Sequence, residues 1–308
     1  MRRRKFLNGE CNHVYQRTVE GFNIFYDQED FLVCYMILSV TARKRNVKIL
    51  SMCFMVDHIH ILIETQTCKE MVDFIRDYSS VYVHEYNRST GREGKLFYKS
   101  FGSAPKKGDK KTRSAIIYIG NNPVEKKLCI SPETYRWNFL AYMDNMTPFS
   151  RKPKISRPLK RALDCLKDAV SADRYINYYL LRRIIAPLSA DEREYFVDSL
   201  ISAYLPIDKK RLYDYFDGFM QMMQAMKATT GSDYDIKEKF YPESDGIYYE
   251  MAKIVREEAG ISPVRKVTVM TTDQKLKIAS HIKSRIPAVT NRQLCKFLQI
   301  KLRKHSND

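Results

Sequence analysis

The chain has 308 residues, of which 44% are hydrophobic, and its 53 Lys and Arg outnumber its 36 Asp and Glu to give a formal net charge of +17. This apolar content can form hydrophobic cores and excludes disorder as the dominant state, while the length favours about two domains. No apolar run approaches the roughly 18 residues that span a bilayer and no signal-type stretch follows the basic first residues, so we expect a cytoplasmic protein whose partner is an anionic polymer, not a membrane.

The first predicted elements are a strand, a helix and a hairpin. Residues 11–18 mix β-branched, aromatic and polar side chains as a half-buried strand does. Residues 27–46 have a helical pattern, which is opened by Asp27 as N-cap and closed by basic residues in the last turn. Two short apolar runs, 47–56 and 58–65, are separated by a single residue, and this predicts a tight β-hairpin.

A helix, a strand and a further helix follow the hairpin. Residues 68–87 place apolar side chains at helical spacings, and residues 95–102 are the predicted fourth strand. A third helix over residues 110–122 is expected to end near Pro123, because proline disfavours helical geometry in the residue before it. The order strand, helix, strand, strand, helix, strand predicts an α+β protein with a ferredoxin-like (RRM-like) antiparallel sheet and helices on one face.

The second half of the sequence predicts a mostly α-helical C-terminal domain. Residues 151–158 are the best linker candidate, because they combine two prolines with a run of basic residues. The predicted domains are therefore residues 1–150 and residues 159–308, joined by this linker. Helical segments are predicted near residues 159–170, 173–186, 189–204, 208–229, 245–260, 272–284 and 290–300.

The last two predicted helices lie in a strongly basic stretch. Residues 251–308 carry 13 basic and 4 acidic side chains. The spacing of the two segments within 272–300 is compatible with a helix-turn-helix, whose second helix enters the major groove of duplex DNA. The residues that it would carry into the groove are Asn291, Arg292, Gln293 and Lys296, and Thr290 or Asn291 would cap it. A pair of packed helices with a solvated basic face fits the pattern equally well.

Two histidines stand two residues apart in the second strand of the predicted hairpin. In a strand, His58 and His60 project from one face, while the isoleucines between and after them project into a core. Two adjacent imidazoles can chelate one metal ion, although most such pairs are ordinary polar positions. The seven cysteines contain no Cys-x-x-Cys pair, which speaks against a cysteine zinc site.

A second cluster lies on the predicted third helix. Tyr118 and Asn122 are four residues apart, so they share a helix face. A tyrosine hydroxyl, with a pKa of about 10, is a poor nucleophile unless its target phosphate is already polarised; the ordinary role of such a tyrosine is that of a core aromatic. The surrounding basic residues would form an electropositive frame for phosphates, and they are Lys106, Lys107, Lys110, Lys111, Arg113, Lys126 and Lys127.

Five motifs together resemble a known family. In chain order they occupy residues 12–17, 24–27, 55–62, 118–124 and 135–138, and they read NHVYQR, IFYD, MVDHIHIL, YIGNNPV and YRWN. This set resembles the single-tyrosine HUH transposases, and within them most closely the REP-associated tyrosine transposases. The resemblance covers about residues 8–145, with the five motifs in the family's order.

The resemblance implies a site and a reaction. His58, His60 and Asn122 would hold a divalent cation, Mg²⁺ or Mn²⁺, and Tyr118 would attack a phosphate of single-stranded DNA to form a 5′-phosphotyrosine and a free 3′-OH. The reverse step would join strands, as transposition and DNA recombination require. A hairpin or inverted repeat beside the cleavage site would supply recognition, with Arg17 among the DNA contacts, and the protein would be associated with the nucleoid. Two points stay open: whether the protein acts as a monomer or a homodimer, and whether Tyr118 serves the metal site of its own chain or that of a dimer partner.

The sequence departs from the family pattern in three places. Asp57 replaces the asparagine that usually precedes the histidine pair, so a negative charge lies beside the expected metal. Residues 17–22 lack the usual Arg-Gly turn, which puts DNA contacts there in doubt. The C-terminal half is larger than a minimal transposase requires, and we expect it to bind DNA or a partner.

Two other functions remain open. The first is a domesticated, catalytically silent DNA-binding regulator that keeps the sheet and the basic frame, and Asp57 argues mildly for it. The second is an RNA-binding protein with an RRM-like sheet. That class stacks bases on aromatic side chains of adjacent central strands, and the hairpin strands supply only Phe54.

Overall fold

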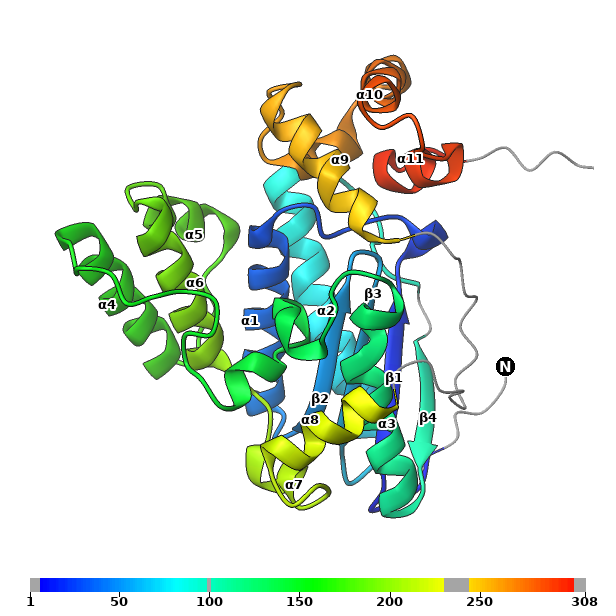
Figure 1. Ribbon diagram of the computed structural model, residues 1–308, viewed down its shortest axis with the longest axis vertical. Coiled ribbons are helices and arrows are strands. Elements are labelled where there is room, and N and C mark those ends of the chain that lie inside the picture. The colour runs from blue at the N-terminus through cyan, green and yellow to red at the C-terminus, as the bar shows by residue number, and fades with distance from the viewer. Residues whose placement is uncertain (1–5, 99–100, 230–243, 302–308) are drawn as a thin grey trace, which may run out of the picture.

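The computed structural model describes residues 6–98, 101–229 and 244–301. Its centre is a four-stranded antiparallel sheet in the order β2-β3-β1-β4, which confirms the predicted ferredoxin-like arrangement (Figure 1). The elements of this part are β1 (Cys11–Arg17), α1 (Gln28–Lys44), β2 (Lys48–Met55), β3 (His58–Glu64), α2 (Cys68–Thr90), β4 (Gly102–Lys106) and α3 (Gly108–Glu125).

Helices cover both faces of the sheet. Alternate residues of β1 and β3 point to opposite faces, and Gln16 on one face accepts a hydrogen bond from Tyr78 of α2. On the other face His60 contacts Asn122 of α3. The helices α1 and α2 therefore pack on one face, as the ferredoxin-like order predicts, and α3 covers the opposite face. The predicted end of α3 near Pro123 is early, since the helix continues to Glu125.

The fourth strand lies after the predicted position of 95–102. The observed β4 begins at Gly102, and residues 99 and 100 of the predicted strand lie outside the described residues. Its sequence, GSAPK, has little intrinsic strand propensity. Pro105 is tolerated because β4 is an edge strand that pairs only with β1.

Gly102 leaves room for the ring of Tyr15 on the neighbouring strand. A Cβ atom at this position would overlap two carbons of that ring. We therefore expect Gly102→Ala to lower the free energy of unfolding by about 1–3 kcal/mol, the usual cost of overpacking, measured by denaturant titration. Ser103→Ala is the matched control, because the buried Ser103 hydroxyl has no hydrogen-bond partner among the described residues. Equal stability of the two variants would contradict this account.

Among the described residues, eight α-helices follow the sheet. They are α4 (Arg157–Ser171), α5 (Tyr178–Ile185), α6 (Ala190–Tyr204), α7 (Lys209–Tyr213), α8 (Phe219–Ala228), α9 (Gly246–Glu257), α10 (Thr272–Arg285) and α11 (Asn291–Leu298). The predicted helix 208–229 is two helices, because Asp217 and Gly218 both adopt positive φ between α7 and α8. Of the two predicted N-caps of α11, Thr290 and Asn291, the structure shows Thr290.

Two apolar cores run through the described residues. The larger is formed by the sheet together with α1–α8, so α4–α8 share a core with the strands. The smaller is formed by α9–α11 with Tyr26 and Val56 from the first part of the chain. In Figure 1, α9, α10 and α11 lie side by side at the upper end of the molecule. The domain boundaries at 150 and 159 stay a prediction.

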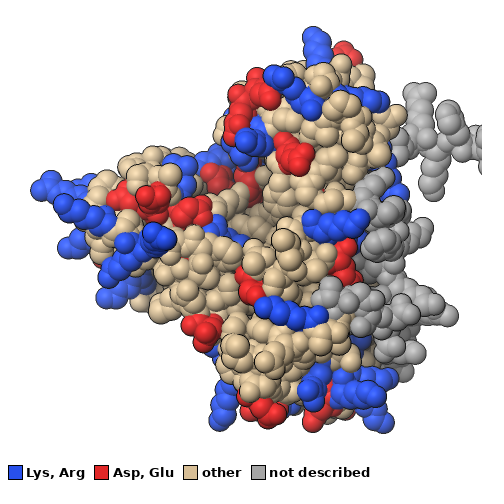
Figure 2. Space-filling view, viewed as in Figure 1, with Lys and Arg blue, Asp and Glu red and all other residues tan. Residues whose placement is uncertain are grey.

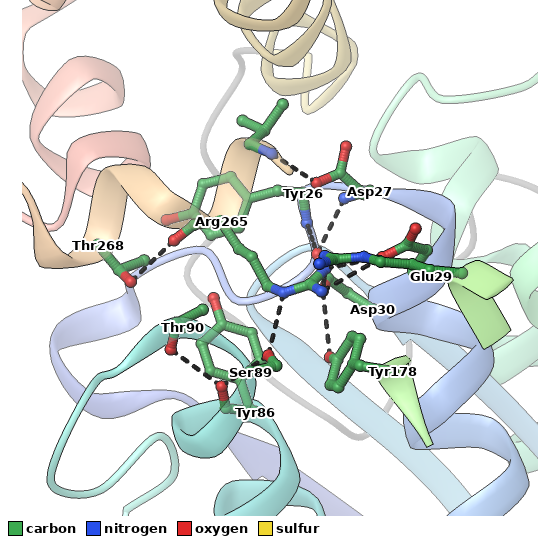
Figure 3. A network of polar contacts seen from close by, with 12 residues as sticks. Tyr26, Asp27, Glu29, Asp30, Tyr86, Ser89, Thr90, Tyr178, Arg265 and Thr268 are labelled. Carbon is green, nitrogen blue, oxygen red and sulfur yellow. Dashed lines mark hydrogen bonds and ion pairs between the residues drawn. The ribbon is translucent and has the colours of Figure 1, made fainter. Parts of the chain in front are cut away.

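A buried arginine joins the smaller core to α1. Arg265, in the 3₁₀ helix η5 (Val264–Val269), is fully buried and donates to Asp30 Oδ1 at 2.8 Å and to Glu29 Oε2 at 3.2 Å (Figure 3). Its guanidinium lies 4.0 Å from the centre of the Tyr178 ring. The first turn of α1 thus collects contacts from segments that are far apart in the sequence.

Among the described residues, every helix is too short or too polar to cross a membrane.

Candidate active site

The two predicted histidines lie on the sheet face that α3 covers. On β3, His58 is opposite Arg17 of β1, and His60 is opposite Tyr15. The isoleucines at 59, 61 and 63 are fully buried on the other face. The rings of His58 and His60 are nearly perpendicular, with centroids 4.9 Å apart. The alternation of β3 therefore brings both imidazoles to one place, as predicted.

Tyr118 and Asn122 approach the histidines from α3. The Tyr118 ring meets the His60 ring edge to face at 5.6 Å, and one turn later Asn122 Nδ2 lies 3.5 Å from His60 Nε2. The four residues expected to carry the chemistry are thus gathered in one cluster. The cluster is closed to solvent, since Tyr118 is 4% exposed and His60 is 0% exposed.

A third histidine completes the cluster. His13 Nε2 on β1 lies 2.9 Å from His60 Nδ1, and the His13 ring also meets the edge of the Tyr118 ring at 5.7 Å. Burial, together with the neighbouring His60 and Lys106, lowers the pKa of His13 well below its usual value. His13 is therefore neutral, and its Nε2 can accept a hydrogen bond from the N–H at His60 Nδ1. His13 belongs to the first of the five sequence motifs, and its spacing alone predicts no role for it.

The histidine pair can present two nitrogens to a cation. Asp57 Oδ1 lies 2.6 Å from His58 Nδ1, and His13 engages Nδ1 of His60, so Nε2 is the nitrogen that each ring could offer to a cation. Ligating histidines ordinarily donate their other N–H to a carboxylate or another acceptor, which fixes tautomer and ring orientation. Asp57, the residue that departs from the family pattern, lies where such an acceptor would be.

The remaining predicted ligand also fits a cation. Asn122 Oδ1 is buried, and the part of the chain that the structure describes gives it no hydrogen-bond partner. A half-turn of this amide would direct Oδ1 toward His60 Nε2, since the oxygen and nitrogen of an amide exchange places. No group of three or more His, Cys, Asp or Glu with metal-binding geometry occurs among the described residues. The candidate set therefore depends on an asparagine oxygen.

Asp57 is held on both of its oxygens. Oδ2 lies 2.9 Å from Nζ of Lys296, which comes from α11. Burial would raise the pKa of Asp57, but the charges of Lys296 and His58 outweigh burial and hold this pKa well below its ordinary range. The carboxylate is therefore ionised at all pH values at which the protein would work.

The predicted DNA contacts fall into three groups. On the outer surface lie Arg17, Lys107, Lys110, Lys111, Arg113, Lys127, Asn291 and Arg292, whereas Lys126 is half-buried and Lys106 is buried beside the histidines. Figure 2 shows basic side chains gathered at the lower end of the molecule, where α3 begins. Gln293 is buried and caps α11 through Thr290, and Lys296 pairs with Asp57, so neither points outward as a groove-reading residue does.

The comparison with family models agrees with the motif resemblance. Residues 2–122 match the family model described as "Transposase IS200 like". A solved REP-associated tyrosine transposase, bound to a REP hairpin, is similar at 14% sequence identity, with a TM-score of 0.38 and coverage of 44% of this chain and 80% of that chain. The search of curated proteins gave no match. The family match confirms the resemblance over residues 2–122, and the fifth motif, at 135–138, lies beyond the matched residues.

Proposed function

We propose that this chain, which carries an IS200-like transposase region over residues 2–122, is a metal-dependent endonuclease and strand transferase of hairpin-bearing single-stranded DNA. The observation that carries the proposal is the single cluster of His58, His60, Tyr118 and Asn122 between β3 and α3. A binding protein gains nothing from placing these four side chains together. Residues 123–308 take no part in the family match.

The reaction follows from the chemistry of the cluster. The Tyr118 oxygen forms a bond to the scissile phosphorus and its proton leaves, while the bond from phosphorus to the 3′ oxygen breaks and that oxygen gains a proton. The product is a 5′-phosphotyrosine and a free 3′-OH. Because the covalent link conserves the phosphodiester energy, a second 3′-OH can reverse the step and join strands. A bound Mg²⁺ or Mn²⁺, held by His58, His60 and Asn122, would act as a Lewis acid on the phosphate oxygens.

The geometry supports use of Tyr118 by its own chain. Its ring touches His60 and His13 of the same chain, at centroid distances of 5.6 and 5.7 Å. A tyrosine that served a second copy would have to leave this packing. We therefore propose that one chain contributes both the histidine pair and the nucleophile.

The metal dependence has a direct test. We expect His58→Ala combined with His60→Ala to abolish nicking in Mg²⁺ or Mn²⁺, while DNA binding falls by less than tenfold, since phosphate contacts elsewhere carry affinity. Nicking of a labelled hairpin substrate and a gel-shift titration measure the two effects. His84→Ala is the control, because His84 is an exposed histidine of α2. Metal-dependent nicking by the double variant would contradict the assignment.

A catalytically silent DNA-binding regulator is the second candidate, and one observation favours it. Tyr118 and His60 are almost completely shielded from solvent, so a DNA strand reaches the hydroxyl only if neighbouring groups move. A covalent protein–DNA species on a denaturing gel supports the enzyme. Its absence with hairpin substrates of both strands, in Mg²⁺ and in Mn²⁺, supports the regulator.

A further inference from the structure

The turn that precedes the histidine pair is joined to the last helix of the described chain. Asp57 uses one carboxylate oxygen for His58 Nδ1, at 2.6 Å, and the other for Lys296 Nζ, at 2.9 Å. The side chains of His58, Asp57 and Lys296 are only 10%, 18% and 22% exposed. A continuous line of polar contacts therefore runs from α11 to a candidate metal ligand.

Helix α11 is fixed against the same turn by its backbone. The carbonyl of Lys296 accepts from Asn23 N at 3.2 Å, and the carbonyl of Phe297 accepts from the Tyr26 hydroxyl at 2.7 Å. The segment between these partners bonds in turn to the residue before Asp57, since Ile24 N donates to Val56 O at 2.9 Å. These hydrogen bonds hold the backbone of α11 beside the turn, and none of them involves the Lys296 side chain.

The ammonium of Lys296 has few other positions open to it. It lies 4.7 Å from the centre of the Tyr248 ring of α9, which attracts a cation through its π face. Burial lowers the pKa of Lys296, but Asp57 outweighs this effect, so that the pKa is raised. The charge is therefore permanent, and it neutralises a carboxylate that is itself largely removed from water.

We propose that Lys296 is a positioning residue for the candidate metal centre, which fixes the Asp57 carboxylate so that Asp57 fixes the tautomer and orientation of the His58 ring. The proposal rests on the proposed function. A carboxylate with two oxygens can rotate away from a histidine when only one oxygen is engaged. When both oxygens are engaged, the carboxylate cannot rotate, and the acceptor of His58 Nδ1–H stays in a fixed position. The His58 ring is then held in one orientation, which also fixes the direction of its Nε2.

It follows that α11 supports the candidate metal centre from outside it. Lys296 acts as an internal support for His58 and not as a reader of the major groove. Outer partners of metal ligands ordinarily affect metal affinity as well as rate, so the role can be measured without any DNA.

Binding of Mn²⁺ to the full chain tests the proposal. We expect Lys296→Met and Asp57→Ala each to weaken Mn²⁺ binding roughly 10- to 100-fold, measured as free Mn²⁺ by electron paramagnetic resonance. Lys296→Arg keeps the charge and should restore most of the affinity. Because the two residues act through one another, the double variant should bind no more weakly than the weaker single variant. Lys277→Met, on the exposed face of α10, is the control and should bind as the unaltered protein does.

Two results would overturn the proposal and leave the proposed function standing. The first is a Lys296→Met protein that keeps unaltered Mn²⁺ affinity and nicking. The second is a double variant whose loss is the product of the single losses, because independent effects indicate separate structural damage. If Lys296→Met fails to fold, Asp57→Ala and Lys296→Arg decide, because the first removes the acceptor of His58 Nδ1–H and the second keeps the charge. An unaltered protein that binds no Mn²⁺ contradicts the proposed function, and the present inference with it.

Discussion

We expect Tyr118→Phe to leave a folded protein that binds hairpin-bearing single-stranded DNA and forms no covalent adduct with it. The phenyl ring keeps the edge-to-face contacts with His13 and His60, so the packing of α3 on the sheet is retained. The variant lacks the attacking oxygen, and loss of a nucleophile lowers the rate by on the order of 10⁶-fold. A denaturing gel with 5′- and 3′-labelled strands measures the adduct, and a gel shift measures binding.

A matched tyrosine makes this experiment specific. Tyr15→Phe changes a ring on the same face of the sheet, 6.5 Å from His13, and should keep the adduct. An adduct that persists in Tyr118→Phe assigns the nucleophile to another residue. If both variants lose the adduct, the loss is caused by disturbed packing on this face of the sheet and not by removal of the nucleophile.

Replacing Arg265 by Met is expected to lower the free energy of unfolding by about 3–5 kcal/mol, because removal of one partner of a buried ion pair leaves the other charge uncompensated. Asp30 is fully buried and loses its 2.8 Å partner, while Glu29 loses a second contact. Met fills a similar volume, so the loss reports charge more than packing. Denaturant titration of the full chain measures it, and the exposed neighbour in Lys266→Met should stay within about 0.5 kcal/mol.

The pH dependence of this loss has a definite sign. Burial raises the pKa of Asp30 to about 6, against the opposing effect of Arg265, and removal of Arg265 raises that pKa further. A carboxyl whose folded-state pKa is raised costs stability as pH rises from its unfolded pKa to its folded pKa, because the unfolded chain ionises first. The deficit of Arg265→Met should therefore be larger at pH 8 than at pH 5. A deficit that is the same at both values would show that Asp30 is not the group left uncompensated.

The parts of the fold that depend on local pattern were predictable. The hairpin of β2 and β3 and the cap of α1 at Asp27 follow from strand alternation and from N-cap chemistry. The strand β4 was misplaced because GSAPK has no strand pattern of its own. Its position depends on pairing with β1 and on the Tyr15 ring over Gly102, which are tertiary contacts.

The candidate site divides in the same way. His58 with His60, and Tyr118 with Asn122, were predictable because the periods of a strand and a helix place each pair on one face. The contact of His13 with His60 needs the register of β1 against β3, which no spacing in the sequence specifies. The contact of Asp57 with Lys296 needs the docking of α11 on the hairpin turn. Lys296 was assigned to a groove-reading helix because the sequence shows its charge and not its neighbour.

The link between Asp57 and Lys296 also sets an order in time. Roughly 240 residues separate the two positions, and a ribosome needs on the order of ten to fifty seconds to add them. For most of that interval the sheet, the histidine pair and Tyr118 have already been made, but Lys296, the outer contact of Asp57, has not. A growing chain therefore passes through a stage at which the four residues of the candidate site are present and the contact of Asp57 with Lys296 has not yet formed.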